Sequence, residues 1–246
     1  MQSADIWKPG KYVYRNNRLA ASRDPEEVCV GSRLITDLIA KFYDENLRKY
    51  AKGRLLDLGC GKVPLYSAYK DCVTDNTCVD WGNSLHRNKH LDHECDLTKP
   101  LPFKDGEYDT VILSDVLEHM PRPELLMKEI SRVMSPDGIL LMNVPFYYWI
   151  HEEPHDFYRY TEFALRYLSE TSGMEVIVLT PTGGAPEIMT DIYAKNILRI
   201  PLVGKPLAVI AQWFAALMIH TSLCAKISRA TAGKFPLGYF MVAKKK

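Results

Sequence analysis

The sequence lacks several features that would assign it to a specialised class of protein. Its six cysteines include no Cys-x-x-Cys pair, so we interpret them as free thiols of a reducing, cytoplasmic compartment. The first ten residues are polar and contain no apolar leader segment, and no internal repeat is visible. The 31 lysines and arginines nearly balance the 30 acidic residues, so the net charge of +1 gives no case for a nucleic-acid partner. What is present is an ordinary globular composition, 47% hydrophobic, that can build a sizeable core.

Strands and helices are expected to alternate along the middle of the chain. Strands are expected at 54–58, 77–81, 93–97, 108–114, 139–144 and 174–180, and helices at 26–50, 122–134 and 161–172. The strand at 139–144 is almost continuously apolar, as in strands that are buried on both faces. This alternation predicts an α/β fold, a doubly wound and mostly parallel sheet with helices on both faces.

The same pattern divides the chain into four segments. Residues 1–53 are expected to form a polar lead-in and a helix, and residues 54–185 the ligand-binding core. Residues 186–234 are expected to form an apolar helical insertion, and residues 235–246 a last strand with a basic tail. Within the insertion, residues 206–225 contain no charged side chain. The length of this uncharged run is about that needed to span a bilayer.

A glycine turn follows the first core strand in the stretch LLDLGCG, residues 55–61. Gly59 and Gly61 would allow backbone to approach a ligand closely, and a helix start beyond them would offer free N–H groups. Asp57 stands two residues before the first glycine. A carboxylate there disfavours a phosphate ligand and favours one that carries an ammonium group.

Two further acids end the next two expected strands. Asp80 follows Asp57 by 23 residues, close to the spacing at which an acid accepts hydrogen bonds from a ribose. Asp96 closes the third expected strand, where a carboxylate could accept from an adenine amino group. All three acids should meet at the carboxyl edge of the sheet, where such folds bind ligands.

These motifs, with CDLTKPLPFKDGEYDTVILSDVLEHM (95–120) and RPELLMKEISRVMSPDGILLMNVP (122–145), resemble class I S-adenosylmethionine-dependent methyltransferases. The similarity is to the UbiE/UbiG-like members, the methyltransferase type 11 group. It implies a seven-stranded sheet with an antiparallel last strand, S-adenosylmethionine as cofactor and no metal. Carried over by position, it implies a cofactor site made of Asp57, Gly59, Gly61, Asp80, Asp96, Leu97, Ser114 and His119. Cys60, a small residue inside the glycine turn, is added to this site, as is Trp81, which could stack on the adenine or fill the edge of the core. Val63 departs from the pattern, because a third glycine is common at that position.

The loop after the fifth strand holds the candidate catalytic residues. Its sequence, HEEPHDFYRYT (151–161), resembles methyltransferases of cell-surface polysaccharide and glycan biosynthesis. An O-methyl transfer needs a base near neutral pH, and histidine is best suited to that task. We predict His155 as the base, oriented by Asp156, with His151 as the other candidate; both histidines could instead be structural. Tyr158 and Arg159 are expected to bind the acceptor, as is Tyr148 just before the loop.

The acceptor itself is inferred from resemblance rather than from residue chemistry. The leading interpretation is a sugar hydroxyl of a glycan or lipid-linked saccharide. Alternatives are a small aromatic or quinone-like metabolite, a nicotinamide-dependent oxidoreductase activity, and a catalytically silent cofactor-binding protein. Asp57 and the missing third glycine argue against the oxidoreductase. Three interpretations of the uncharged run at 206–225 stay open: packing on the domain, homo-oligomer formation and peripheral membrane contact. A single crossing of a membrane is disfavoured, because it would separate the last strand from its sheet.

Overall fold

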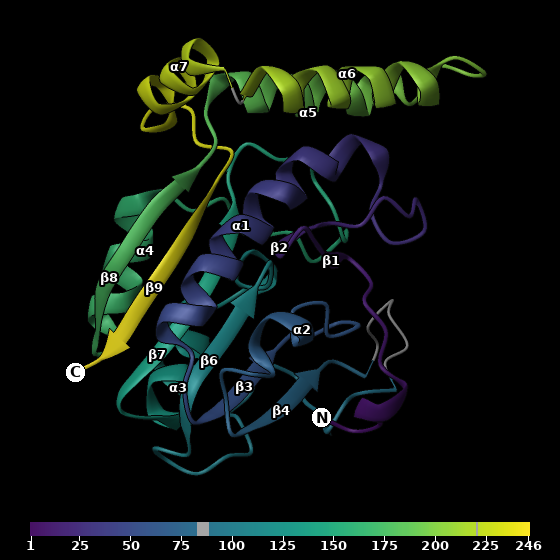
Figure 1. Cartoon of the computed structure of the whole chain (residues 1–246). Helices are drawn as coiled ribbons and strands as arrows, with labels where there is room; N and C mark the ends of the chain where they lie inside the picture. Colours follow the sequence, from purple (N-terminus) through teal and green to yellow (C-terminus); the bar gives the residue numbers. More distant parts are fainter. Residues whose placement is uncertain (83–88, 220) are drawn as a thin grey trace.

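A seven-stranded sheet forms the centre of the molecule, in the order β5-β4-β3-β6-β7-β9-β8 (Figure 1). The computed structural model describes residues 1–82, 89–219 and 221–246. The strands are β3 (Arg54–Leu58), β4 (Asp75–Asp80), β5 (His93–Glu94), β6 (Tyr108–Ser114), β7 (Met134–Pro145), β8 (Met174–Thr182) and β9 (Gly238–Lys245). Strands β5, β4, β3, β6 and β7 pair in parallel, and β9 lies antiparallel between β7 and β8. The predicted fold class is confirmed.

Helices cover both faces of this sheet because its central strands are apolar on both sides. Leu55 points to one face, where α1 (Arg33–Tyr50) and the short α2 (Tyr66–Tyr69) pack. Leu56 points to the other face, where α3 (Pro123–Val133) and α4 (Glu162–Thr171) pack. Adjacent residues of one strand therefore enter two separate cores, as the period of two in a strand requires.

The N-terminal region is more ordered than the sequence suggested. A hairpin of β1 (Tyr12–Arg15) and β2 (Arg18–Ala21) stands where a loose lead-in was expected. Asn16 and Asn17 form its turn with φ of 50° and 59°, a conformation that asparagine tolerates. The hairpin is anchored to α1, since the Ala21 amide donates to Asp37 at 2.7 Å. The helix expected from residue 26 begins only at Arg33, after a 3-10 turn at Val30–Ser32.

Two strand expectations also need correction. The third strand, expected at 93–97, contains only His93–Glu94, so Asp96 lies in the turn beyond it. Strand β7 begins at Met134 rather than 139, and it contains the expected turn at 136–138 as an irregularity. Both differences leave the order of the strands unchanged.

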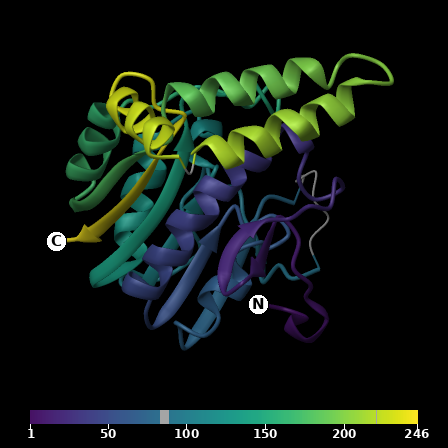
Figure 2. The same ribbon diagram turned by 45° about the horizontal axis from the view of Figure 1, so that its top comes forward.

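Three helices fill the chain between β8 and β9: α5 (Ala185–Ile197), α6 (Gly204–Ile219) and α7 (Ser222–Ala232) (Figures 1 and 2). His220, in the uncharged run, lies outside the described residues. In the described part of the chain no single helix is long and apolar enough to cross a membrane; only α6 and α7 together, bent by 92°, pass that test of length and composition. Thr182 at the end of β8 pairs with Gly238 at the start of β9, so the chain leaves and re-enters the sheet at one edge.

Candidate functional site

The glycine turn after β3 has the geometry of a ligand cradle. Gly59 and Gly61 have φ of 68° and 50°, a region that glycine occupies without strain. A side chain at Gly59 would place its Cβ 2.4 Å from Val116, so nothing larger fits. The turn is fixed to β4, because the amides of Gly59 and Cys60 donate to the Val79 carbonyl at 2.8 and 3.0 Å.

Val63 occupies the position at which a third glycine is common, and the structure shows how a valine fits this turn. Val63 has φ of 54°, a left-handed conformation that is rare for a β-branched residue. Its side chain is fully buried, and its carbonyl accepts a hydrogen bond from the Trp7 indole at 3.2 Å. The backbone thus keeps the shape that glycine would adopt most easily, and local packing supports a valine there.

Asp57 lies buried beneath the turn, 3% exposed. The Tyr69 hydroxyl donates to its Oδ2 atom at 3.4 Å. Burial raises the pKa of Asp57 to about 7, opposed by that hydrogen bond, and nearby Asp80 raises it further. A carboxyl group in this position gains most from a cationic ligand, which fits the ammonium group of a bound S-adenosylmethionine.

Asp80 ends β4 and joins the turn to the following loop. Its Oδ2 atom accepts from the Gly61 amide at 3.0 Å, and Oδ1 accepts from the Trp81 amide at 2.7 Å. The carboxylate therefore lies at the carboxyl edge of the sheet, directly beside the cradle. Trp81 is 44% exposed, and its ring meets the His155 ring edge-on at 5.6 Å.

Asp96 and Leu97 lie farther along the same edge. Asp96 accepts from the amide and hydroxyl of Thr98, at 3.0 and 2.7 Å, and these bonds lower its pKa. Leu97 is buried in the core under α3 and α4. The structure thus gives Asp96 a local partner, and its contact with adenine stays a prediction.

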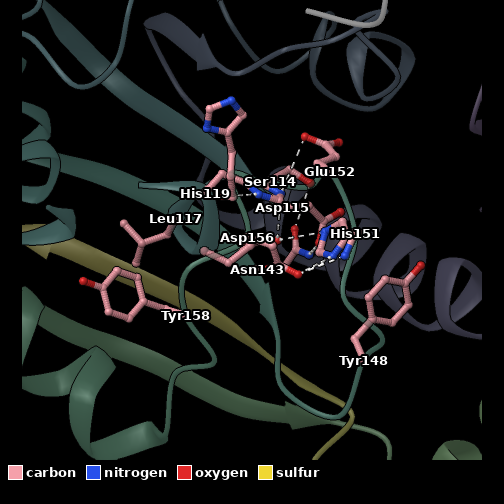
Figure 3. A network of polar contacts seen from close by, with 12 residues as sticks. Ser114, Asp115, Leu117, His119, Asn143, Tyr148, His151, Glu152, Asp156 and Tyr158 are labelled. Atoms are coloured by element: carbon pink, nitrogen blue, oxygen red, sulfur yellow. Dashed lines mark hydrogen bonds and ion pairs between the residues drawn. The ribbon is translucent and has the colours of Figure 1, made fainter. Parts of the chain in front are cut away.

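A polar network links the ends of β6 and β7. Ser114 and Tyr43 both donate to Oδ1 of Asn143, each at 2.8 Å. The side-chain amide of Asn143 donates in turn to Asp115 (Figure 3). Asp115 also pairs with Lys11 at 3.0 Å. Only Ser114 of this network was expected from sequence. A buried asparagine within the apolar run 139–144 was the available signal, because a buried polar side chain needs partners.

A cavity of about 230 Å³ adjoins this network. Of the predicted site residues, His151 and Tyr148 line it. Its polar lining consists of Lys11, Glu27, Ser32, Thr36, Asp115, Asn143, Tyr148, His151, Glu152 and Thr182. The walls thus carry cations, carboxylates, amides and hydroxyls, a mixture suited to a ligand with many hydrogen-bonding groups.

His151 meets two carboxyl groups at the cavity wall. Its Nε2 atom lies 3.8 Å from Oε1 of Glu118, and its Nδ1 atom lies 3.2 Å from Oδ2 of Asp156 (Figure 3). Burial lowers the pKa of His151, and His119 lowers it further. Burial raises the pKa of Glu118, whose side chain is fully enclosed, well above its usual value. Both groups are therefore favoured in their neutral forms.

His119 completes a cluster around Glu118. Its Nε2 atom lies 3.8 Å from Oε1 of Glu118, and its ring centroid lies 4.8 Å from that of His151. One ligand atom from each of the three residues lies within 4.8 Å of the others, so together they could hold a metal ion. No metal was expected from the sequence.

The predicted pairing of Asp156 with His155 is wrong. Asp156 accepts from the backbone amide of His151 at 3.0 Å and pairs with both terminal nitrogens of Arg159. That guanidinium group holds the pKa of Asp156 well below its usual value. The His155 side chain is exposed and lies against Trp81 instead. Sequence proximity favoured His155, but the loop folds back so that residues five apart, rather than neighbours, come together.

The two remaining predicted acceptor ligands lie off the cavity. Tyr158 donates to the Pro121 carbonyl at 3.1 Å and points away from His151 (Figure 3). Arg159 is engaged by Asp156 and also donates to the Trp149 carbonyl at 3.1 Å. Their binding of an acceptor stays a prediction.

Comparisons with known proteins identify the family of the chain. A family model described as a methyltransferase domain matches residues 31–175. The chain is 30% identical over 118 residues to the human thiol S-methyltransferase TMT1B, covering 42% of this chain and 45% of that protein. It is 34% identical over 111 residues to the uncharacterized protein MJ0638 of Methanocaldococcus jannaschii, covering 45% and 46%. The chain thus matches less than half the length of each curated relative.

Solved structures share the fold at low identity. A SAM-dependent methyltransferase from Archaeoglobus fulgidus aligns with a TM-score of 0.51 and 16% identity, covering 83% of this chain and 93% of that one. The [4+2]-cyclase SpnF aligns with a TM-score of 0.53 and 18% identity, covering 85% and 82%. These similarities support the fold alone. With the family match over more than half of its length, the chain belongs to the methyltransferase domain family.

Proposed function

We propose that this enzyme, of the UbiE/UbiG-like type, methylates a sugar hydroxyl of a glycan or lipid-linked saccharide. The observation that carries the proposal is the His151 imidazole, neutral through burial and placed on the cavity wall. A hydroxyl is a weak nucleophile, so its methylation gains from a base that accepts the proton as the new bond forms. The polar lining of the cavity and the sequence HEEPHDFYRYT support a polyhydroxyl acceptor over a quinone-like metabolite.

The cofactor would be held by the glycine turn at Gly59 and Gly61, with Asp57 near its ammonium group and Asp80 near its ribose. When bound, S-adenosylmethionine supplies an electrophilic methyl group. His151 would accept the proton that the acceptor hydroxyl loses as this methyl group is transferred, while Asp156 fixes the loop through the His151 amide. Alignment of the acceptor in the cavity would supply much of the remaining acceleration.

A thiol is the second candidate acceptor, because the chain resembles the human thiol S-methyltransferase over part of its length. A thiol ionises far more readily than a hydroxyl and has less need of a base. Transfer of radiolabelled methyl groups to simple glycosides, a polyprenyl-linked sugar, a catechol and a small thiol distinguishes these classes. We expect labelled glycoside or polyprenyl-linked sugar. Labelling confined to the thiol or the catechol would overturn the saccharide proposal.

Removal of divalent metal ions should leave turnover unchanged, because His151 accepts the proton without a Lewis acid. The measurement compares rates before and after dialysis against a chelator, with the metal content of the protein determined in parallel. A loss of activity that manganese or zinc restores would contradict this expectation. It would mean that Glu118, His119 and His151 hold an ion, and that His151 is a ligand rather than a base.

A further inference from the structure

Helices α5 and α6 expose large apolar side chains, and their buried positions include polar and charged ones, unlike ordinary surface helices. On α5 the buried side chains include Asp191 and Lys195, which form an ion pair at 2.7 Å. Met189 and Ile192 on the same helix are 71% and 54% exposed. A soluble helix places its apolar stripe on the core and its charges in water. In α5 the arrangement is inverted.

Helix α6 repeats this inversion with larger side chains. Its buried positions carry Ala208, Gln212 and Ala215, which recur at helical spacing on the inner face. Its outward positions carry Ile210, Trp213 and Phe214, of which Trp213 is 66% exposed. The turn that joins α5 and α6 (Figures 1 and 2) contains Leu202, whose side chain is 98% exposed.

Together these side chains form a surface that we name the outer face. Its members are Met189, Ile192, Tyr193, Ile200, Leu202, Val203, Leu207, Val209, Ile210, Trp213, Phe214, Leu217, Leu223 and Ile227. Helices α5 and α6 lie side by side across the end of the molecule and extend beyond the sheet (Figure 2). An exposed apolar surface of this kind marks a site of contact with protein or lipid.

Beyond Asp191, the segment that forms the rest of α5, α6 and α7 carries charges of one sign. All 30 aspartates and glutamates of the chain occur before residue 192, whereas nine of the 31 lysines and arginines occur after it. Arg199, Lys205, Lys226, Arg229 and Lys234 are exposed, and none pairs with an acid in the part of the chain that the structure describes. Large apolar side chains flanked only by cations match an anionic lipid surface.

The inner sides of α5 and α6 contact elements that line the cavity. Gln212 of α6 donates to the Gly31 carbonyl at 2.8 Å and accepts from the Leu34 amide at 3.0 Å. The neighbouring Ser32 lines the cavity. From α5, the Lys195 ammonium lies 3.5 Å from the ring centre of Tyr148, which also lines it. Helices α5 and α6 would therefore form a layer between a surface bound to the outer face and the elements that line the cavity.

We propose that the outer face docks the enzyme on an anionic lipid surface, as a peripheral contact. A crossing is disfavoured because Thr182 and Gly238 pair at one edge of the sheet, so the chain must return to the side it left. Docking would bring the cavity to acceptors that are held at a membrane. The inference concerns where the enzyme works, and it does not require a particular acceptor.

Flotation with lipid vesicles tests this proposal on the full chain without any methyl acceptor. The vesicles contain phosphatidylcholine alone or phosphatidylcholine mixed with phosphatidylglycerol, at low and high salt. We expect stronger binding to the anionic vesicles, weakened by salt. The double variant Trp213→Glu/Phe214→Glu should lose at least about ten-fold in affinity, because two apolar side chains are exchanged for charges. Lys226→Ala/Arg229→Ala should lose the preference for anionic vesicles.

A matched control comes from helix α4, which contributes no residue to the outer face. Phe163 and Tyr167 on α4 are 74% and 67% exposed, so Phe163→Glu/Tyr167→Glu removes similarly exposed aromatic groups from outside the outer face. This control should bind vesicles like the parent protein. Binding of S-adenosylhomocysteine by all variants verifies that they are folded. Equal binding by the outer-face and control variants would overturn the proposal, as would a stable dimer in solution that Trp213→Glu/Phe214→Glu dissociates.

Discussion

Replacement of His151 by alanine should lower turnover by about a hundred-fold or more, the usual contribution of a general base. His151 is the histidine that lines the cavity, and burial favours its neutral, proton-accepting form. Affinity for S-adenosylhomocysteine should change little, because the imidazole acts on the acceptor. Single-turnover rates and calorimetric affinities, measured on the same variant, separate these two effects. An equal loss in both would indicate a collapsed loop rather than a missing base.

The pH dependence of the parent enzyme adds an independent test. Only the neutral imidazole can accept a proton, so the rate should rise with pH through the ionisation of His151. Because burial lowers this pKa, the midpoint of the rise should lie below the usual histidine value of about 6.5. The rise should vanish in His151→Ala. A profile that is the same in both proteins would remove His151 as the titrating group.

His155→Ala is the matched control for this experiment, because the two histidines belong to one loop. The His155 ring lies beside Trp81, on the side of Asp80 and the cofactor cradle. We expect its removal to cost less turnover than removal of His151. A hundred-fold loss in His155→Ala, with His151→Ala nearly unchanged, would restore the interpretation made from sequence.

The fold could be predicted from sequence because its signals are local and redundant. Strand β6 is flanked by turns, and the glycines of LLDLGCG require a tight turn after β3. Where the signal was weak, the prediction failed. The hairpin of β1 and β2 has only four residues in each strand and depends on Asp37 and Asp44 of α1, contacts that no local pattern reveals.

The cofactor edge of the site could be predicted better than the acceptor side. Asp57 and Asp80 lie near the carboxyl ends of β3 and β4, and parallel strands bring these ends together however the loops between them fold. The acceptor side depends on how the loop at 151–161 folds, and sequence order does not determine which of its side chains meet. Lys11 and Asn143 come from distant elements, so their approach to Asp115 follows only from the packed structure.

Replacement of Asp80 by alanine should weaken S-adenosylhomocysteine binding by at least about ten-fold. Hydrogen bonds to a charged group contribute roughly 1.5–3 kcal/mol each, and about 1.4 kcal/mol corresponds to a factor of ten. The variant would lose the expected bonds to the ribose hydroxyls. It would also lose the bond from the Gly61 amide, which holds the glycine turn in place. Asp80→Asn keeps one acceptor oxygen and should therefore lose less affinity than Asp80→Ala.

Asp75→Ala provides the control from the same strand. Asp75 begins β4 and Asp80 ends it, so the two carboxylates lie at opposite edges of the sheet. If ligands bind only at the carboxyl edge, Asp75→Ala should bind S-adenosylhomocysteine like the parent enzyme in calorimetry. Unchanged affinity in a folded Asp80→Ala variant would remove Asp80 from the cofactor site. A similar loss in both variants would show that β4 responds to any change of charge, and that the position of Asp80 at the strand end is not the cause.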